Sequence, residues 1–277
     1  MSKLGLIAGG GDLPRAVAES ARADGREVFI AAVTGSLTED WVKDFPHEFI
    51  SIGAPGHAFK SFRREGVTDV LLAGKVDRPD FSSLKVDMKG VMLLPRAIKA
   101  ARQGDDALLR FVVTFFEEEG FHAIGVAEAA PGLVCGEGNL GRITPNADHR
   151  ADMEAAFSIV KALGALDVGQ AAVVCEGLPL AVEAAEGTDR MIERVGTLRT
   201  ALRGTPEKKR GVLVKALKPT QDALSDMPVI GVETVERAAA AGLAGIGLQA
   251  GGALIVDKAM VAARADALGL FIAGLRV

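Results

Sequence analysis

Short apolar runs alternate with segments of helical periodicity along the first 130 residues. The runs are typical of buried strands, and the periodic segments place apolar side chains three or four positions apart, as one face of an amphipathic helix does. The expected strands are Leu4–Ala8, Glu27–Ala32 and Asp69–Ala73, and the expected helices are Leu13–Asp24, His57–Glu65, Pro95–Ala101 and Asp106–Glu119. Repeated strand–helix units predict a Rossmann-like domain over residues 1–130, with a mainly parallel sheet and helices on both faces.

The second half repeats this alternation after an aperiodic stretch. Residues 131–147 are rich in Gly, Pro and Asn and are interpreted as a linker, so residues 148–277 form a second α/β domain, the catalytic one. Its expected elements are helix 148–163, strands Ala171–Cys175 and Leu180–Ala184, a helix capped at or beside Thr188 and running to about Leu202, strand Gly211–Ala216, helix Thr234–Ala241, strands Gly245–Leu248 and Leu254–Val256, helix Lys258–Leu268 and strand Leu270–Gly274. The apolar stretch Met88–Leu94 is interpreted as core, and an apolar cleft for lipid tails is the alternative.

Composition narrows the class of protein. The 277 residues are 49% hydrophobic and 25% charged, which fits a globular chain with a substantial core. A net charge of −4 gives no electrostatic reason to expect nucleic acid as a partner. The two cysteines, Cys135 and Cys175, lie in no metal-binding spacing, and no apolar run reaches membrane-spanning length. Because the apolar run at the start meets glycines at once, it predicts a strand and a turn, and the expected location is cytoplasmic.

A glycine turn, Gly9-Gly10-Gly11, follows the first expected strand and precedes a helix. Glycine lets backbone amides approach a phosphate, so Gly10 and Gly11 are candidate substrate-binding residues; a plain tight turn is the alternative. The spacing is not that of a dinucleotide fingerprint, and no acid ends the second strand to hold a ribose. Lys75 follows the third strand, where ligands collect in open α/β sheets, and is a candidate for anion contact.

Acids and lysines gather between residues 170 and 231, beside short apolar runs. Carboxylates are the ligands that magnesium prefers, and lysines neutralise phosphate oxygens, so this mixture favours metal-assisted chemistry at a phosphate. Glu186 and Asp189 are candidate metal ligands or helix caps, and the Thr188 hydroxyl is a candidate donor to an anion. Asp226 precedes Met227-Pro228 in a segment with no helix to cap, which makes it the first candidate for metal ligand or general base.

Several sequence blocks together carry a family resemblance. They are LGLIAGGG at the start, GDDALLR at 104–110, QAAVVCEG at 170–177, AVEAAEGTDRM at 181–191, and the block from Lys218 to Gly231 that contains QD, D-x-P and IG. In this order and nearly end to end, the chain resembles the UDP-2,3-diacylglucosamine pyrophosphatases of lipid A biosynthesis, of the type unrelated to calcineurin-like phosphoesterases.

The resemblance implies an enzyme of Gram-negative bacteria with two α/β domains that hold an acylated UDP-sugar between them. It implies hydrolysis of UDP-2,3-diacylglucosamine to UMP and 2,3-diacylglucosamine 1-phosphate by water attack on the sugar-side phosphorus, with Mg²⁺ or another divalent cation such as Mn²⁺. The family's key aspartate falls on Asp226. Two positions depart from the family pattern: Ala171 stands where glycine is usual, and Leu224 where arginine is usual.

The working hypothesis is therefore a pyrophosphohydrolase with Asp226 and Asp222 as catalytic residues and Asp226, Asp189 and Glu186 as metal ligands. The candidate substrate-binding residues are Gly10, Gly11, Lys75, Gln170, Thr188, Lys215, Lys218 and Gln221. Two alternatives stay open at this point: a Rossmann-like NAD(P)-dependent oxidoreductase, and a non-catalytic protein that binds UDP-sugar or lipid. Peripheral contact with the inner membrane and a homodimer are further expectations about partners.

Overall fold

The computed structural model describes residues 2–76, 86–218 and 227–276, apart from the side chains of Asp105 and Asp106. The chain divides between Gly132 and Leu133 into two compact units. Each unit has its own β-sheet covered by helices, which confirms the expected two-domain α/β class. None of the helices in the described residues combines the length and apolarity that a bilayer crossing needs.

The sheet of the first unit has five strands among the described residues, in the order β3-β2-β1-β4-β5, and all neighbouring pairs are parallel. The strands are β1 (Lys3–Ala8), β2 (Val28–Val33), β3 (His47–Ile50), β4 (Val67–Ala73) and β5 (His122–Ala123). This order is that of a doubly wound, Rossmann-like sheet. Central strands buried on both faces, such as the fully buried β2, explain why the sequence shows unbroken apolar runs here.

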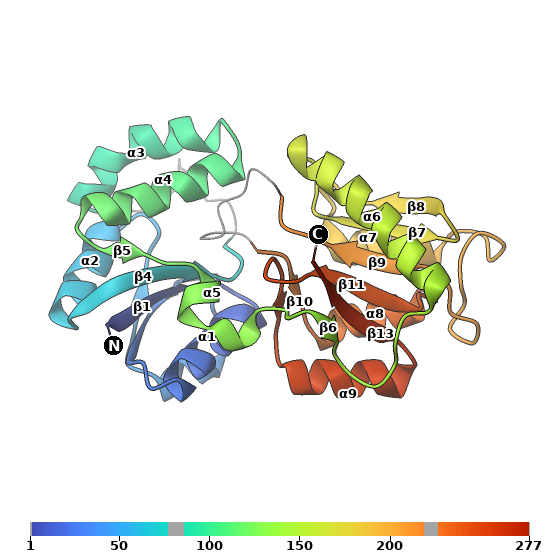
Figure 1. Ribbon diagram of the computed structural model, residues 1–277. Helices are drawn as coiled ribbons and strands as arrows, with labels where there is room; N and C mark the ends of the chain where they lie inside the picture. Colours follow the sequence, from blue (N-terminus) through green and yellow to red (C-terminus); the bar gives the residue numbers. More distant parts are fainter. Residues whose placement is uncertain (1, 77–85, 219–226, 277) are drawn as a thin grey trace. The chain divides into compact units, whose positions relative to one another are not determined.

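Helices cover both faces of this sheet (Figure 1). They are α1 (Asp12–Ala23), α2 (Pro55–Arg64), α3 (Met88–Ala101), α4 (Asp105–Glu118) and the short α5 (Val126–Ala129), with two 3₁₀ turns at Asp40–Asp44 and Pro131–Leu133. The face under α2 and α4 carries a phenylalanine cluster in which the ring of Phe59 contacts those of Phe115, Phe116 and Phe121.

The sheet of the second unit is mixed. Its order is β6-β13-β11-β9-β7-β8, where β9, β11 and β13 run parallel and β6, β7 and β8 each run antiparallel to a neighbour. The bounds are β6 (Gly138–Asn139), β7 (Ala171–Cys175), β8 (Leu178–Val182), β9 (Val212–Lys215), β11 (Gly245–Gln249) and β13 (Phe271–Leu275). A separate parallel pair consists of β10 (Val229–Ile230) and β12 (Leu254–Ile255).

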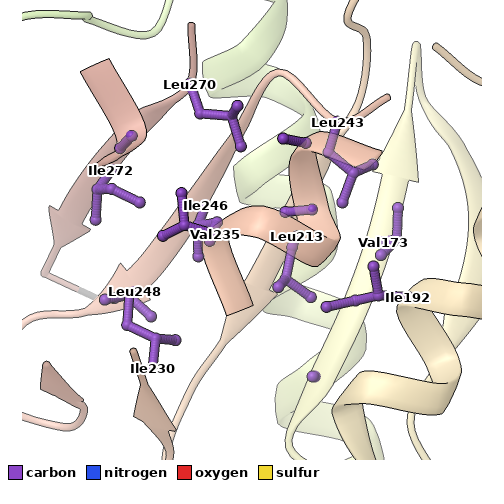
Figure 2. Close-up of a cluster of buried hydrophobic side chains, with 14 of the residues drawn as sticks. Val173, Ile192, Leu213, Ile230, Val235, Leu243, Ile246, Leu248, Leu270 and Ile272 are labelled. Carbon is purple, nitrogen blue, oxygen red and sulfur yellow. The ribbon is translucent and has the colours of Figure 1, made fainter. Parts of the chain in front are cut away.

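Two hydrophobic layers enclose this second sheet. The helices are α6 (Ala147–Ala165), α7 (Gly187–Gly196), α8 (Val232–Ala240) and α9 (Lys258–Leu268). Helix α6 packs on one face through Met153, Phe157 and Val160. The larger core lies on the other face, where Ile192 of α7 and Val235 of α8 meet Leu213, Ile246 and other strand side chains (Figure 2).

Three sequence expectations about elements need correction. Helix α3 begins at Met88 and continues through Pro95, so the stretch that was expected as core is the first half of a helix, and Met88 is exposed. Helix α7 ends at Gly196, well before Leu202, and its N-cap is Glu186 with no side-chain cap. Residues 131–147, expected as a linker, include β6, which pairs with β13, so from Leu133 onward they belong to the second unit.

Candidate functional site

The carboxyl edge of the second sheet gathers polar side chains from strands that are distant in sequence. The parallel strands β9 and β11 end here at Lys215 and Gln249, and the antiparallel β7 begins beside them, with Ala171 opposite Lys215. The Ala216 amide donates to the carbonyl of Gln170 at 3.1 Å, and the Leu217 amide donates to Gln249 Oε1 at 2.9 Å. Ligands collect at this edge of open α/β sheets, so it is the candidate site.

Two lysines lie at this edge: Lys215 is the last residue of β9, and Lys218 follows the strand. Lys215 is only 6% exposed, and its Nζ donates to the carbonyl of Val229 at 3.1 Å. Lys218 Nζ pairs with Asp167 Oδ1 at 2.9 Å. A buried ammonium is costly unless it has oxygen partners, and the Val229 carbonyl is one partner of Lys215.

Glu183 connects two other predicted residues. Its carboxylate is nearly buried, with the residue 7% exposed, and accepts hydrogen bonds from the Gln170 amide at 3.0 Å and from Thr188 Oγ1 at 2.7 Å. The backbones approach closely here, because a Cβ at Gly169 would lie 2.2 Å from the Glu183 carbonyl oxygen. The structure therefore brings Gln170 and Thr188 to opposite oxygens of one carboxylate. Thr188 was expected at or beside the cap of helix α7, but the N-cap residue in the structure is Glu186.

The two candidate metal ligands in the described residues have arginine partners. Glu186 accepts from Arg194 at 2.9 Å, and Asp189 lies 3.8 Å from Arg237. The Glu186 backbone amide, and then Arg194, hold the pKa of the Glu186 carboxyl below its usual value. Within the described ranges no three His, Cys, Asp or Glu side chains are close enough together to hold a metal ion.

The glycine turn of the first unit uses its amides internally. Gly9 donates to the carbonyl of Ala73, and Gly10 and Lys75 exchange two backbone hydrogen bonds, all at 2.9 Å. The carboxylate of Glu39 accepts a hydrogen bond from the Thr38 amide at 3.0 Å. The amide of Thr38, and then those of Glu39 and Gly11, lower the pKa of this carboxyl. Because the Gly10 amide is already paired, the turn is closed to a phosphate at that position. The Lys75 side chain remains exposed.

Asp222, Asp226 and Gln221 lie outside the described residues. The described residues on either side of that segment are Lys218 and the buried Met227. Sequence reasoning selected neither Glu183 nor Gln249 as a site residue. The available signal for Glu183 was an acid directly after an apolar run; its burial depends on the pairing of β7 with β8, which a local pattern does not specify.

Comparison with known proteins identifies relatives along nearly the whole chain. Residues 3–133 match the family model for the LpxI N-terminal domain, and residues 136–273 match that for the LpxI C-terminal domain. The chain is 49% identical over 275 residues to the UDP-2,3-diacylglucosamine pyrophosphatase LpxI of Caulobacter vibrioides. That alignment covers 99% of this chain and 98% of the relative. These matches confirm the resemblance that was seen in the sequence blocks.

Proposed function

Because the chain belongs to the LpxI family, we propose that it hydrolyses the pyrophosphate bond of UDP-2,3-diacylglucosamine, releasing UMP and 2,3-diacylglucosamine 1-phosphate. The observation that carries this proposal is the 49% identity to a pyrophosphatase of that name across 99% of the chain. The cationic edge of the second sheet supports it, because a diphosphate needs positive charge close to its oxygens.

Lys215 and Lys218 have complementary roles in this proposal. Lys215 is rigid, because its Nζ is tied to the Val229 carbonyl, and a fixed ammonium neutralises charge without reorganising during the reaction. Among the described residues, Lys218 is paired with the carboxylate of Asp167, whose side chain is largely exposed. A phosphate oxygen can therefore replace Asp167 as the partner of Lys218 at small cost.

A divalent cation, Mg²⁺ or Mn²⁺, is part of the proposal. Glu186 and Asp189 would have to leave arginine partners to bind it, so we assign the main contact to Asp226, with Asp222 beside it in sequence as a second catalytic residue. Bound there, the cation would polarise the phosphoryl group and lower the pKa of its water. The ion pairs with Arg194 and Arg237 argue against Glu186 and Asp189 as the main ligands of the cation.

The direct test is an assay of UMP release from UDP-2,3-diacylglucosamine in heavy-oxygen water. We expect release that stops on chelation, returns with Mg²⁺, and places the heavy oxygen on one product. Asp226→Ala should reduce turnover at least about a thousandfold with the thermal unfolding curve unchanged. Substitution of Asp189, which is tied to Arg237, should reduce turnover far less. Turnover of Asp226→Ala near the wild-type rate would remove Asp226 from the reaction, and no UMP release by the wild type would contradict the proposal itself.

We also propose that the protein is cytoplasmic and touches the inner membrane peripherally, since its substrate carries acyl chains. Helix α3 supports this contact: Met88, Val91 and Met92 are exposed on its first half, and Lys99 and Arg102 are exposed at its end. Apolar side chains beside basic ones fit the surface of an anionic bilayer.

A homodimer is a further part of the proposal, and sedimentation equilibrium tests it. The exposed Leu166 and Leu178 of the second unit are candidate contacts.

A further inference from the structure

The hydroxyl of Thr188 has already committed its hydrogen. Thr188 Oγ1 lies 2.7 Å from Glu183 Oε1, and a carboxylate oxygen in this position accepts. A hydroxyl carries one hydrogen and two lone pairs, so Thr188 can offer a ligand only an acceptor. An anion such as a phosphate offers acceptors too, and would be repelled by this oxygen rather than bound.

A second acceptor belongs to Gln170, whose backbone amide bonds to the same carboxylate. The backbone amide of Gln170 donates to Glu183 Oε2 at 3.0 Å, and the side-chain oxygen of Gln170, Oε1, is buried with no hydrogen-bond partner among the described residues. A buried acceptor without a donor is destabilising, and a ligand that donates to it would recover that loss. Gln170 immediately precedes β7, and its carbonyl already accepts from Ala216, so the whole residue is fixed at the sheet edge.

We propose that Gln170 Oε1 and Thr188 Oγ1 form an acceptor pair that binds hydroxyl groups of the substrate's ribose or hexose, and not its diphosphate. Glu183 is the positioning residue, because it holds Thr188 in the acceptor orientation and holds the backbone of Gln170. This assignment rests on the proposed function and divides its site into two parts. Lys215 and Lys218 neutralise phosphate oxygens, and the two acceptors held by Glu183 recognise the sugar. It reverses the expectation that the Thr188 hydroxyl donates to an anion.

The test compares products and their deoxy forms as ligands of the full-length protein. For the ribose arm, UMP is measured against 2′-deoxyUMP and 3′-deoxyUMP; for the hexose arm, 2,3-diacylglucosamine 1-phosphate is measured against its 4-deoxy and 6-deoxy forms. We expect one deoxy form to bind the wild type about tenfold more weakly than its parent, the loss of one hydrogen bond. The ratio of the dissociation constant of the deoxy form to that of its parent should fall to about one in Thr188→Val. Thr188→Ser should restore the wild-type ratio.

Glu183→Gln should also shrink the ratio, because an amide at this position can donate to Thr188 and turn its hydroxyl towards the ligand. The matched control is Thr197→Val, since the Thr197 hydroxyl donates to the carbonyl of Arg194 at the other end of α7. That variant should keep the wild-type ratio. Thermal unfolding of each variant separates a loss of fold, which would weaken parent and deoxy ligands alike, from a loss of recognition.

Two outcomes would overturn the inference. One is equal binding of parent and deoxy ligands by the wild type in both arms. The other is a Thr188→Val variant that keeps the wild-type ratio but binds inorganic pyrophosphate more weakly, which would return Thr188 to the phosphates. Both readouts are binding constants, so they stay informative if the wild type releases no UMP. If the wild type releases UMP but binds parent and deoxy ligands equally, the proposed function stands and only this inference fails.

Discussion

At the scale of single residues, one buried carboxylate fixes the hairpin that supplies the candidate site. The side chain of Asp152 on α6 is buried, with the residue 3% exposed, and accepts from the amides of Glu176 at 2.9 Å and Gly177 at 2.8 Å. These two residues connect β7 to β8, and both have positive φ, which leaves their amides pointing away from the hairpin's own ladder. Asp152 therefore supplies the turn with the partners that the strands do not.

Asp152→Ala should lower the free energy of unfolding by about 1–3 kcal/mol, because it removes the buried carboxylate that accepts from both turn amides. Urea denaturation measures the change. Asp148→Ala, an exposed acid one turn earlier on the same helix, should change stability by less than about 0.5 kcal/mol. Equal stability of the two variants would show that water serves the turn as well as Asp152 does.

Glu119 gives the first unit an acid-sensitive contact. The ammonium of Lys89 bonds to one carboxylate oxygen, and Arg63 bonds to the other at 2.8 Å; together they lower the pKa of Glu119. A carboxyl whose pKa is depressed by folding contributes stability that is present above its unfolded pKa and is lost as the pH falls through its folded pKa.

Glu119→Gln should therefore cost about 1–2 kcal/mol of unfolding free energy at pH 7, and the difference from the wild type should shrink as the pH falls below about 4. Unfolding free energies along a pH series test this. Glu117→Gln, which changes an exposed acid of α4, is the control and should change stability at pH 7 by less than about 0.5 kcal/mol. A Glu119→Gln deficit that is the same at every pH would assign the loss to packing instead.

At the scale of elements, the sequence predicted those whose ends carry local signals. Helix α9 matches its expected bounds because Asp257 caps it, accepting from the Met260 amide at 3.0 Å, and Gly269 ends it in the left-handed region. Helix α3 was missed at its start because Pro95 is typical of a helix beginning. In the structure Asp87 caps the helix about two turns earlier, accepting from Gly90. Pro95 lies on the exposed side, where its missing N–H is tolerated.

The site was less predictable than the elements because its geometry depends on pairing. The sequence selected Gln170 and Thr188 separately, but nothing local places both against Glu183, which requires β8 to lie antiparallel beside β7. In the same way, the glycine turn suggested a phosphate contact, and only the bridge between Gly10 and Lys75 shows that its amide is in use. Strand order and register are non-local, so they decide which polar groups remain available.

Helix α3 makes the proposed membrane contact testable at this scale. Met88 and Met92 are 84% and 74% exposed, so serine at both positions removes apolar surface without opening the core. The double variant should bind vesicles that contain anionic phosphatidylglycerol at least about tenfold more weakly in sedimentation assays. Leu166→Ser, at an exposed position of the second unit, is the control. Unchanged binding of the double variant would exclude this face of α3 from the contact.

At the scale of the whole molecule, each unit encloses its own hydrophobic core. The position of the boundary between the units therefore determines which fragment of the chain can fold alone. The stretch from Leu133 to Asn146, which its composition marks as a linker, is joined to the second sheet by backbone hydrogen bonds. The Cys135 amide donates to Ala253 and its carbonyl accepts from Gly251, both at 2.8 Å, while the Leu140 amide donates to Ile272 at 2.9 Å. Cys135 is itself buried in the core that Figure 2 shows in part.

A fragment of residues 133–277 should therefore fold alone, with a single cooperative thermal transition, because it contains a complete sheet and core. A fragment of residues 148–277, cut where composition alone would place the domain, lacks β6 and Cys135 and leaves the backbone groups of β13 and of residues 251–253 unpaired. Its transition should be lower by at least about 10 °C or lose cooperativity. Circular dichroism melts of the two fragments make the comparison, with residues 1–132 as the complementary piece. Indistinguishable melting of the longer and shorter fragments would mean that residues 133–147 are only a connection after all, and that the pairing of β6 adds nothing to the fold.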